Sequence, residues 1–303
     1  MAREFDILVA GGGIAGLTAG LTAARLGRSV QVLTGDVLGG NLLSVEKIEG
    51  FPGFADGVAG YELCPITQGQ AAEAGAGFDM TEVTELQADG ARWNVTDRNE
   101  TFSAGAVIIA TGASIKELDV PGEEALRGRG VSHCASCDAP LLKDKVVAVI
   151  GGGDSAAQEA LTLADAASSV TIYCRGDALT AKAVYQTRIE AHAAIDVRYG
   201  TEIDKILGDD GVTGISVGGD DIACDGVFIY IGLAPNTGFL SSLLELNNDG
   251  RVPVDEDLRS IAPGLFAAGC VRSGSAGQAV SSAGDGAAAA IAADAYLASG
   301  TWR

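Results

Sequence analysis

Short apolar runs that end in glycine recur along the chain, and such runs are typical of strands buried on both faces of a parallel sheet. One run covers residues 5–10 and another covers residues 145–150. Each is followed by a Gly-rich turn, an Ala-rich helix over 14–25 or 154–164, and a further apolar strand. Strand, turn, helix and strand within about 30 residues form a βαβ unit. The sequence therefore predicts two such units, the second about 140 residues after the first.

The rest of the pattern predicts a long loop over 39–53, a helix near 60–74 and an Ala-rich helix from 278 to about 299. Residues 233–237 are predicted to form a turn, because Gly and Pro punctuate the chain there. Further strands are predicted near 29–33, 77–88, 92–97, 100–104, 106–112, 169–173, 196–199, 203–207, 214–217, 226–231 and 264–269.

The predicted fold class is α/β, with two Rossmann-like nucleotide-binding domains of the three-layer ββα type. The C-terminal tail has no Gly-rich fingerprint of its own, so we expect it to complete the first domain. The second domain is then inserted into the first through linkers near 113–118 and 233–238. The expected boundaries are 1–115 and 237–303 for the discontinuous first domain and 116–236 for the second.

Composition narrows the class of protein. The chain of 303 residues is 47% apolar and carries a net charge of −20, with a pI near 4.3. A strongly negative field argues against nucleic acid and anionic membrane surfaces as partners. No apolar run reaches about 18 residues, so no transmembrane helix is predicted. The N-terminus has no signal-peptide pattern, and we expect a cytoplasmic protein.

The first Gly-rich turn has the dinucleotide-binding spacing Gly11-x-Gly13-x-x-Gly16. In this motif the first glycine makes the turn, the second lets the backbone approach a pyrophosphate, and the third lets helix and strand pack closely. The acidic residue expected at the end of the second strand is missing, since Thr34 stands there and Asp36 follows just beyond. The second turn, Gly151-x-Gly153-x-x-Ala156, repeats the motif with alanine in the third place.

A Cys-x-x-Cys pair, Cys134 and Cys137, lies just before the second βαβ unit, and Asp138 follows it directly. In a reducing compartment such a pair is typical of redox catalysis, with one thiolate available for attack. A neighbouring carboxyl group can act as its acid or base. His133 could assist or be a solvated loop residue. The other cysteines (Cys64, Cys174, Cys224 and Cys270) are isolated and there are two histidines, so no metal site is predicted.

The chain resembles the low-molecular-weight thioredoxin reductases over nearly its whole length, most specifically over 128–138. The resemblance implies a homodimeric FAD protein with a smaller nicotinamide domain, carrying the Cys-x-x-Cys pair, inserted into the FAD domain. It implies that Cys137 lies next to the flavin, that Cys134 attacks the substrate disulfide, and that Asp138 is the acid/base. It also implies that thioredoxin or a similar small dithiol protein is the substrate.

Two sets of residues are expected to bind the cofactors. Those for FAD are Gly11, Gly13, Ile14, Ala15, Gly16, Gly40, Asn41, Val83, Ala110, Thr111, Gly112, Gly269, Cys270, Gln278 and Ala279, and those for NADPH or NADH are Gly151, Gly153, Asp154, Ser155 and Arg175.

Departures from the family pattern leave parts of this reading open. The His-Arg-Arg run that holds the 2′-phosphate of NADPH is here Cys174-Arg175-Gly176, and Thr180 replaces a further Arg. No acidic residue replaces these cations, so the choice between NADPH and NADH stays open. Cys270 stands where the family has an Asp at the FAD ribityl chain, and losing that ionised acceptor costs about 1–3 kcal/mol if the contact is buried. Cys270 is either a tolerated change or a third redox sulfur.

Three functions follow. The leading hypothesis is electron transfer from NAD(P)H through FAD to the Cys134/Cys137 disulfide and on to thioredoxin or a similar protein. The alternative is a related enzyme that does not use NADPH, either a ferredoxin-driven disulfide reductase or an oxygen-dependent dithiol oxidase. The third is a flavin-binding regulatory or assembly protein in which the cysteine pair is vestigial.

Overall fold

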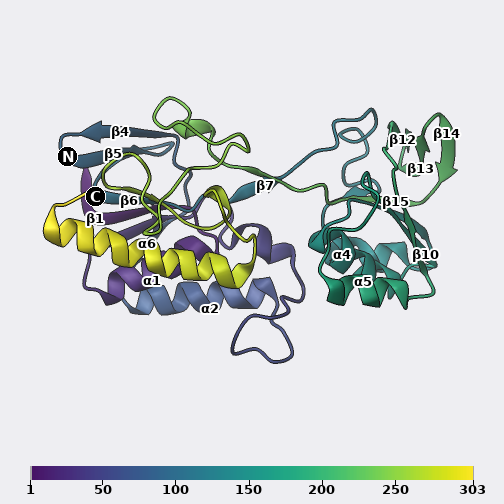
Figure 1. Cartoon of the computed structure of the whole chain (residues 1–303), viewed down its shortest axis with the longest axis horizontal. Helices are drawn as coiled ribbons and strands as arrows, with labels where there is room; N and C mark the ends of the chain where they lie inside the picture. Colours follow the sequence, from purple (N-terminus) through teal and green to yellow (C-terminus); the bar gives the residue numbers. More distant parts are fainter. Residues whose placement is uncertain (1, 303) are drawn as a thin grey trace. The chain divides into compact units, whose positions relative to one another are not determined.

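The structure of the protein is a computed structural model that describes residues 2–302, except for the side chains of Ser136 and Cys137. The chain forms two compact units, one made of Met1–Ser114 with Ala234–Arg303 and the other of Ile115–Leu233. The first crossing falls at 114 where 115 was expected, and the second at 234 where 237 was expected. The fold is α/β with parallel sheets in both units, as the sequence predicted (Figure 1).

The first unit is built on a sheet of order β3-β2-β1-β6-β5-β4, with β17 paired to β6. Strands β1, β2, β3, β6 and β17 are parallel, whereas β4 and β5 form an antiparallel ribbon on β6. The elements are β1 (Arg3–Ala10), α1 (Ile14–Arg25), β2 (Val30–Leu33), α2 (Gly60–Glu73), β3 (Gly77–Asp79), β4 (Glu85–Asp89), β5 (Arg92–Thr96), β6 (Thr101–Ile109), β17 (Leu265–Ala267) and α6 (Ala279–Ser299), with short 3₁₀ helices η1 (Gly40–Ser44), η3 (Gly238–Leu240) and η4 (Gly269–Val271).

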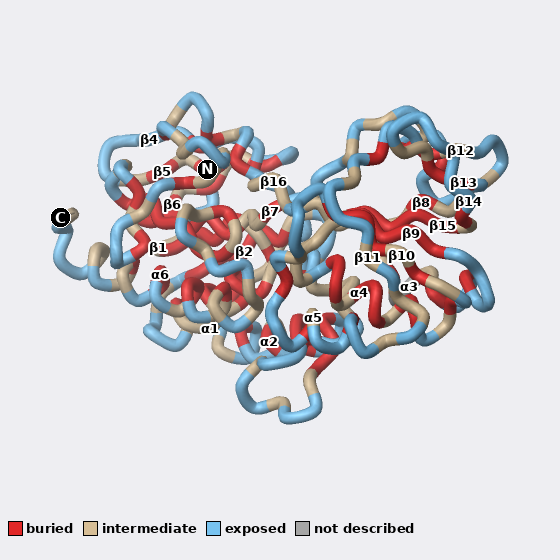
Figure 2. The backbone as a smooth tube through the Cα atoms, turned by 45° about the vertical axis from the view of Figure 1, so that its right-hand side comes forward, coloured by how far each residue is buried: buried red, intermediate tan, exposed pale blue. Residues whose placement is uncertain are grey.

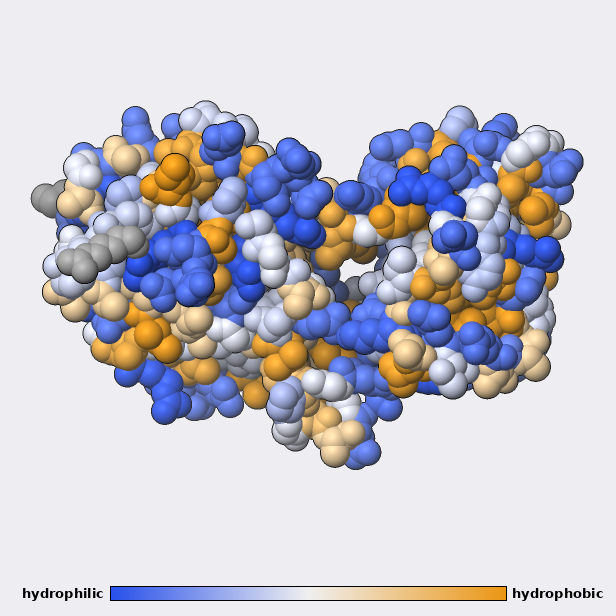
Figure 3. Space-filling view, viewed as in Figure 1, coloured by the Kyte–Doolittle hydropathy of each residue, from blue (hydrophilic) through white to orange (hydrophobic). Residues whose placement is uncertain are grey.

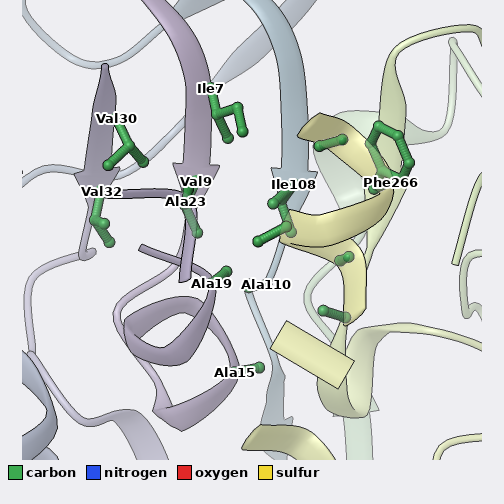
Figure 4. Close-up of a cluster of buried hydrophobic side chains, with 14 of the residues drawn as sticks. Ile7, Val9, Ala15, Ala19, Ala23, Val30, Val32, Ile108, Ala110 and Phe266 are labelled. Atoms are coloured by element: carbon green, nitrogen blue, oxygen red, sulfur yellow. The ribbon is translucent and has the colours of Figure 1, made fainter. Parts of the chain in front are cut away.

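Alternate residues of β1 face two different layers. Ile7 and Val9 pack with the helices α1 and α6 (Figure 4). Leu8 and Ala10 belong to a second cluster with the β4–β5 ribbon. The inner face of α1 carries alanines, and at Gly286 of α6 a Cβ would overlap the carbonyl oxygen of Ala15. Small residues therefore let the two helices approach closely and set α1 firmly against the sheet.

The second unit has a parallel sheet of order β11-β10-β9-β15-β8 and a separate antiparallel sheet β12-β13-β14. Figure 2 shows that β9, β10 and β15 are buried, while the connecting loops are exposed. Its elements are β8 (Val131–Ser132), α3 (Ala135–Asp138), η2 (Ala139–Leu142), β9 (Val146–Ile150), α4 (Asp154–Ala164), β10 (Ser169–Tyr173), α5 (Ala183–Glu190), β11 (Ile195–Arg198), β12 (Lys205–Gly208), β13 (Val212–Val217), β14 (Asp220–Ala223) and β15 (Gly226–Ile229).

The chain crosses between the units in two short strands that pair with each other, β7 (Ala113–Ile115) and β16 (Leu233–Pro235). The backbone N–H of Lys116 donates to the carbonyl of Gly232, and that of Asn236 donates to the carbonyl of Gly112, both at 3.0 Å. Residues 233–235 are therefore a strand, and the prediction of a turn there was wrong.

Other elements also differ from the prediction. The strands expected at 100–104 and 106–112 are one strand, β6, which runs through Gly105. A Cβ at Gly105 would lie 2.7 Å from Leu297 of α6, so glycine there marks close helix packing and not a break. The expected loop over 39–53 contains η1, and α5 and β14 were not predicted.

Hydrophobic and hydrophilic residues are interspersed over the surface shown in Figure 3. Among the helices of residues 2–302, none combines the length and the apolar character that crossing a membrane requires.

Candidate functional site

The first Gly-rich turn has the backbone that its sequence predicts. Gly11 has a φ of 118°, and a Cβ there would overlap the carbonyl of Ala110. A Cβ at Gly16 would overlap the carbonyl oxygen of Gly11, so this position must lack a side chain. At Gly13, by contrast, a Cβ would meet nothing within 4 Å. The turn is therefore closely packed at two glycines and open at the one where a pyrophosphate is expected.

Helix α1 begins directly after this opening. Gly13 is its N-cap residue, no side chain caps it, and its first turn has no acidic residue. The first N–H groups of a helix have no partner within the helix, and the helix dipole favours a negative charge beside them. The start of α1, at Ile14 and Ala15, is thus suited to an anion such as a phosphate.

Several of the other residues expected at FAD lie around this turn. The N–H of Gly39 donates to the carbonyl of Gly12 at 2.8 Å, which places the start of η1, with Gly40, against the turn. The Asn41 side-chain amide donates to the carbonyl of Ala113 at 2.7 Å. Residues Ala110, Thr111 and Gly112 follow β6, and the N–H of Ala110 donates to Ala10 at the end of β1.

The C-terminal segment reaches the same place. A Cβ at Gly269 would lie 3.0 Å from the Cβ of Ala15. Cys270 follows in η4 with a free, half-buried thiol, and its carbonyl accepts a hydrogen bond from Arg251 at 3.1 Å. Gln278 is the N-cap of α6, and Ala279 packs on the cluster that contains Ile14.

The side chains of Val83 and Asp36 are engaged in contacts within the first unit. Val83 is buried in the core below the β4–β5 ribbon, so its side chain is part of the packing. Asp36, beyond the end of β2, forms two hydrogen bonds with Arg98 at 2.9 and 3.0 Å, and Arg98 also binds Glu82. The carboxylate nearest the end of β2 is therefore already paired with a cation.

Sequence reasoning missed an acidic residue beside this site. Asp285 of α6 accepts a hydrogen bond from the N–H of Gly269 at 3.0 Å. Its two oxygens also bind the guanidinium of Arg272, each at 2.7 Å, and the two side chains are only 11% and 17% exposed. The pair fixes the backbone just before Cys270. An acidic residue within the Ala-rich helix was the signal that could have pointed to it.

The second Gly-rich turn resembles the first but is more closely covered. Gly151 has a φ of 135°, and a Cβ there would overlap the carbonyl of Tyr230. Gly153 is the N-cap of α4 without a side-chain cap, and Ser155 is exposed in the first turn. Asp154 accepts the N–H of Lys182 at 2.7 Å and pairs with its ammonium group at 3.2 Å.

The redox segment lies between β8 and η2. Cys134 is disulfide-bonded, half-buried and at the N-cap of α3, and its N–H donates to the hydroxyl of Ser132 at 3.0 Å. The Cys137 side chain lies outside the described residues, and so does the prediction that it is the flavin-side sulfur. Asp138 ends α3 and its N–H donates to the carbonyl of Cys134 at 3.3 Å.

Residues of β15 support this segment. The N–H of Ala135 donates to the hydroxyl of Tyr230 at 3.2 Å, and burial raises the pKa of that phenol, so it stays protonated. The Nδ1 of His133 lies 3.0 Å from the carbonyl oxygen of Ile229, and its ring is half-buried. His133 therefore lies in a bend, half-buried and held to the end of β15, and its assistance to the dithiol stays a prediction.

The isolated cysteines behave as packing residues. Cys64, Cys174 and Cys224 are buried and free. Burial raises the pKa of Cys64 to about 11 and that of Cys224 to about 12, which keeps both thiols protonated and unreactive near neutral pH. Within the described part of the chain, no group of three or more His, Cys, Asp or Glu side chains is placed to hold a metal ion.

Two Gly-rich turns with uncapped helix N-termini and a disulfide-bonded Cys134 within a Cys-x-x-Cys sequence define a class of flavin-dependent disulfide oxidoreductases. The family model described as pyridine nucleotide-disulphide oxidoreductase matches residues 5–286. The thioredoxin reductase of Treponema pallidum is 35% identical over 98% of both chains. That of Mycolicibacterium smegmatis is 39% identical over 97% of this chain and 96% of its own.

A solved structure of Lactococcus lactis thioredoxin reductase matches with a TM-score of 0.93 and 33% identity, over 97% of this chain and 99% of that one. The chain therefore belongs to the low-molecular-weight thioredoxin reductase family and is an FAD-dependent disulfide oxidoreductase. These relatives do not favour the ferredoxin-driven or oxygen-dependent alternative. Membership implies FAD and a nicotinamide nucleotide, and the open Gly13 and the uncapped start of α1 fit a dinucleotide.

Proposed function

We propose that this enzyme reduces a disulfide of thioredoxin, or of a similar small dithiol protein, with electrons from a nicotinamide nucleotide. The observation that carries the proposal is the occurrence, in one chain, of the disulfide of Cys134 and of two Gly-rich turns whose helices begin without a side-chain cap. The names of the relatives support thioredoxin as the partner class. A cytoplasmic location and a homodimer belong to the same proposal.

The first unit holds FAD in this proposal. The N–H groups at the start of α1 bind its pyrophosphate, where Gly13 leaves the backbone open. The segments at Gly40, at Ala110–Gly112 and at Gly269 border the rest of the cofactor. When bound, FAD supplies two-electron transfer between the nicotinamide and the disulfide. The second turn, at Gly151 and Gly153 and the start of α4, holds the nicotinamide nucleotide in the same way.

The dithiol then passes the electrons to the substrate. After reduction, the thiolate of Cys134 attacks one sulfur of the substrate disulfide, and a mixed disulfide forms while the other substrate sulfur leaves as a thiolate. Asp138 donates the proton that this leaving thiolate needs. Cys137 attacks the Cys134 sulfur of the mixed disulfide, which releases the reduced substrate and restores the oxidised pair.

The test combines three single substitutions with anaerobic titration. Cys134→Ser and Cys137→Ser should each abolish thioredoxin reduction. In both variants the nicotinamide nucleotide should still bleach the flavin absorbance at about 450 nm. Asp138→Asn should keep flavin bleaching and lower thioredoxin turnover about 10²-fold, the usual size of a general acid–base contribution. Failure of both NADH and NADPH to bleach the flavin at millimolar concentration would contradict the proposal that a nicotinamide nucleotide is the electron donor. Full turnover in the serine variants would contradict the role of the dithiol.

A further inference from the structure

An open pocket of ≈ 350 Å³ lies beside the end of β10 in the second unit. Three charged residues line it, Arg175, Glu202 and Asp204, and all three are exposed. Strand β10 is the second strand of the βαβ unit that starts with the Gly151 turn. In such units the residues just after the second strand meet the adenosine ribose of the bound dinucleotide. The pocket therefore shares Arg175, just after β10, with the position expected to recognise the ribose.

The acidic side of the pocket is held in place by the backbone. The N–H of Thr201 donates to the carbonyl of Cys174 at 3.0 Å, and that of Gly200 donates to Gly176 at 2.9 Å. The segment before Glu202 is thus fastened to the two residues on either side of Arg175. Asp204 is fixed from the other side, because its carboxylate accepts the N–H of Gly219 at 3.4 Å.

The charges in this pocket favour one nucleotide over the other. A 2′-phosphate adds about two negative charges and needs cations around it. Here one guanidinium, Arg175, shares the pocket with two carboxylates, so its sides are net negative. Carboxylates accept hydrogen bonds from ribose hydroxyl groups, which is how dinucleotide sites recognise the 2′-OH of NAD. The acidic residue that is missing directly after β10 is thus supplied by the segment after β11.

We propose that this enzyme selects NADH over NADPH, with Glu202 and Asp204 as the residues that determine the choice. The inference rests on the proposed nucleotide site of the second unit. It assigns the choice of electron donor to Glu202 and Asp204, which follow β11 in the sequence and line one pocket with Arg175.

The experiment uses the full-length, FAD-loaded protein and measures the binding of NAD⁺ and NADP⁺ by calorimetry, together with kcat/KM for NADH and NADPH. Wild-type protein should prefer NADH at least about tenfold, and the Glu202→Gln/Asp204→Asn double variant should move the ratio about tenfold toward NADPH. Arg175→Ala should weaken NADP⁺ binding and leave NAD⁺ binding within about twofold.

Asp209→Asn/Asp210→Asn is the matched control. It also removes two negative charges from the second unit, but from residues outside the pocket. It should change the preference for NADH over NADPH by less than about twofold. Because the substitutions lie in the second unit and FAD is proposed to bind the first, thermal melting followed by circular dichroism shows that each variant is folded. A wild-type preference for NADPH, or a double variant that shifts no further than the control, overturns the inference.

Failure of the wild-type protein to bind either nucleotide also overturns the inference, together with the nicotinamide part of the proposed function. Protein reduced with dithionite then tests the remaining part separately, because the flavin and the dithiol need no nucleotide to reduce thioredoxin.

Discussion

The two Gly-rich turns of this chain open with the same three glycines, but the structure surrounds them differently. Around the first turn, Gly13 faces open space and α1 lies so close that Gly16 admits no side chain. At the second turn, Ala156 occupies the third position without difficulty, and the loop at Thr180 and Lys182 hydrogen-bonds to the turn. A shared motif therefore fixes the turn and leaves the tightness of packing to the neighbouring elements.

This difference has a functional meaning. The first turn is bordered by η1, the end of β6 and η4, all of the same unit, as a site for a permanently held cofactor requires. The second turn packs against Tyr230 and Cys174, and the side of Gly153 faces the exposed Thr180, which suits a nucleotide that must enter and leave in every cycle. Substitutions at equivalent positions should therefore have unequal effects.

The largest difference is expected at the third position of each motif. In Gly16→Ala the new Cβ would overlap the carbonyl oxygen of Gly11, so helix and turn must separate. We expect the protein to lose most of its FAD. In the second unit, Ala156→Gly should only weaken α4, by about 1 kcal/mol. The ratio of bound FAD to protein measures the first effect, and the melting temperature measures the second. A Gly16→Ala protein with full FAD would contradict the comparison.

The next effect concerns the buried pair Arg272–Asp285, which the second unit does not repeat near its turn among the described residues. Arg272→Met leaves the Asp285 carboxylate without its cation and should lower the unfolding free energy by about 3–5 kcal/mol. Arg98→Ala, which removes the cation of two exposed ion pairs in the same unit, should cost clearly less. Urea denaturation compares the two, and equal losses would show that the buried pair is not special.

The smallest effect concerns pH, through one buried thiol in each unit. Burial raises the folded pKa of Cys64 to about 11 and that of Cys224 to about 12, while an unfolded thiol ionises near about 8.5. Above that pH the unfolded chain releases protons that the folded chain keeps, so the unfolding free energy falls as pH rises.

In Cys64→Ala and Cys224→Ala, the decrease in unfolding free energy that the removed thiol causes at high pH should disappear. Urea unfolding at about pH 7.5, 9 and 10, values that bracket the pKa of an unfolded thiol, measures how the unfolding free energy changes with pH in each variant and in wild type. Slopes identical to wild type in both variants would mean that neither thiol is protected by burial.

The sequence predicted both βαβ units because their strands are continuous apolar runs and their helices begin at glycines. It could not predict β14, whose four residues are all exposed and show no apolar pattern. Helix α5 was missed for a similar reason, since only Tyr185 and Ile189 are buried and two positions make a weak periodicity. Glycine was misread in β6, where Gly105 serves a tertiary contact that only the fold reveals.

The site shows the same limit. The Gly-rich turns and the Cys-x-x-Cys pair are local patterns, and local patterns can be read from a sequence. Glu202 and Asp285 could not be assigned, because each gains its meaning from a residue that the fold brings to it, Arg175 in one case and Gly269 in the other. Tertiary neighbours of this kind leave no spacing to recognise.

The pairing of β7 with β16 has a consequence for the history and engineering of this chain. A path that leaves a domain and re-enters it through two adjoining strands can gain or lose everything in between as a single cassette. Ser114 and Ala234 flank that cassette, and a tight turn joining them would close the remaining chain into a hairpin. Joining Ser114 to Ala234 would leave the first unit, the one proposed to hold FAD, as a single continuous chain.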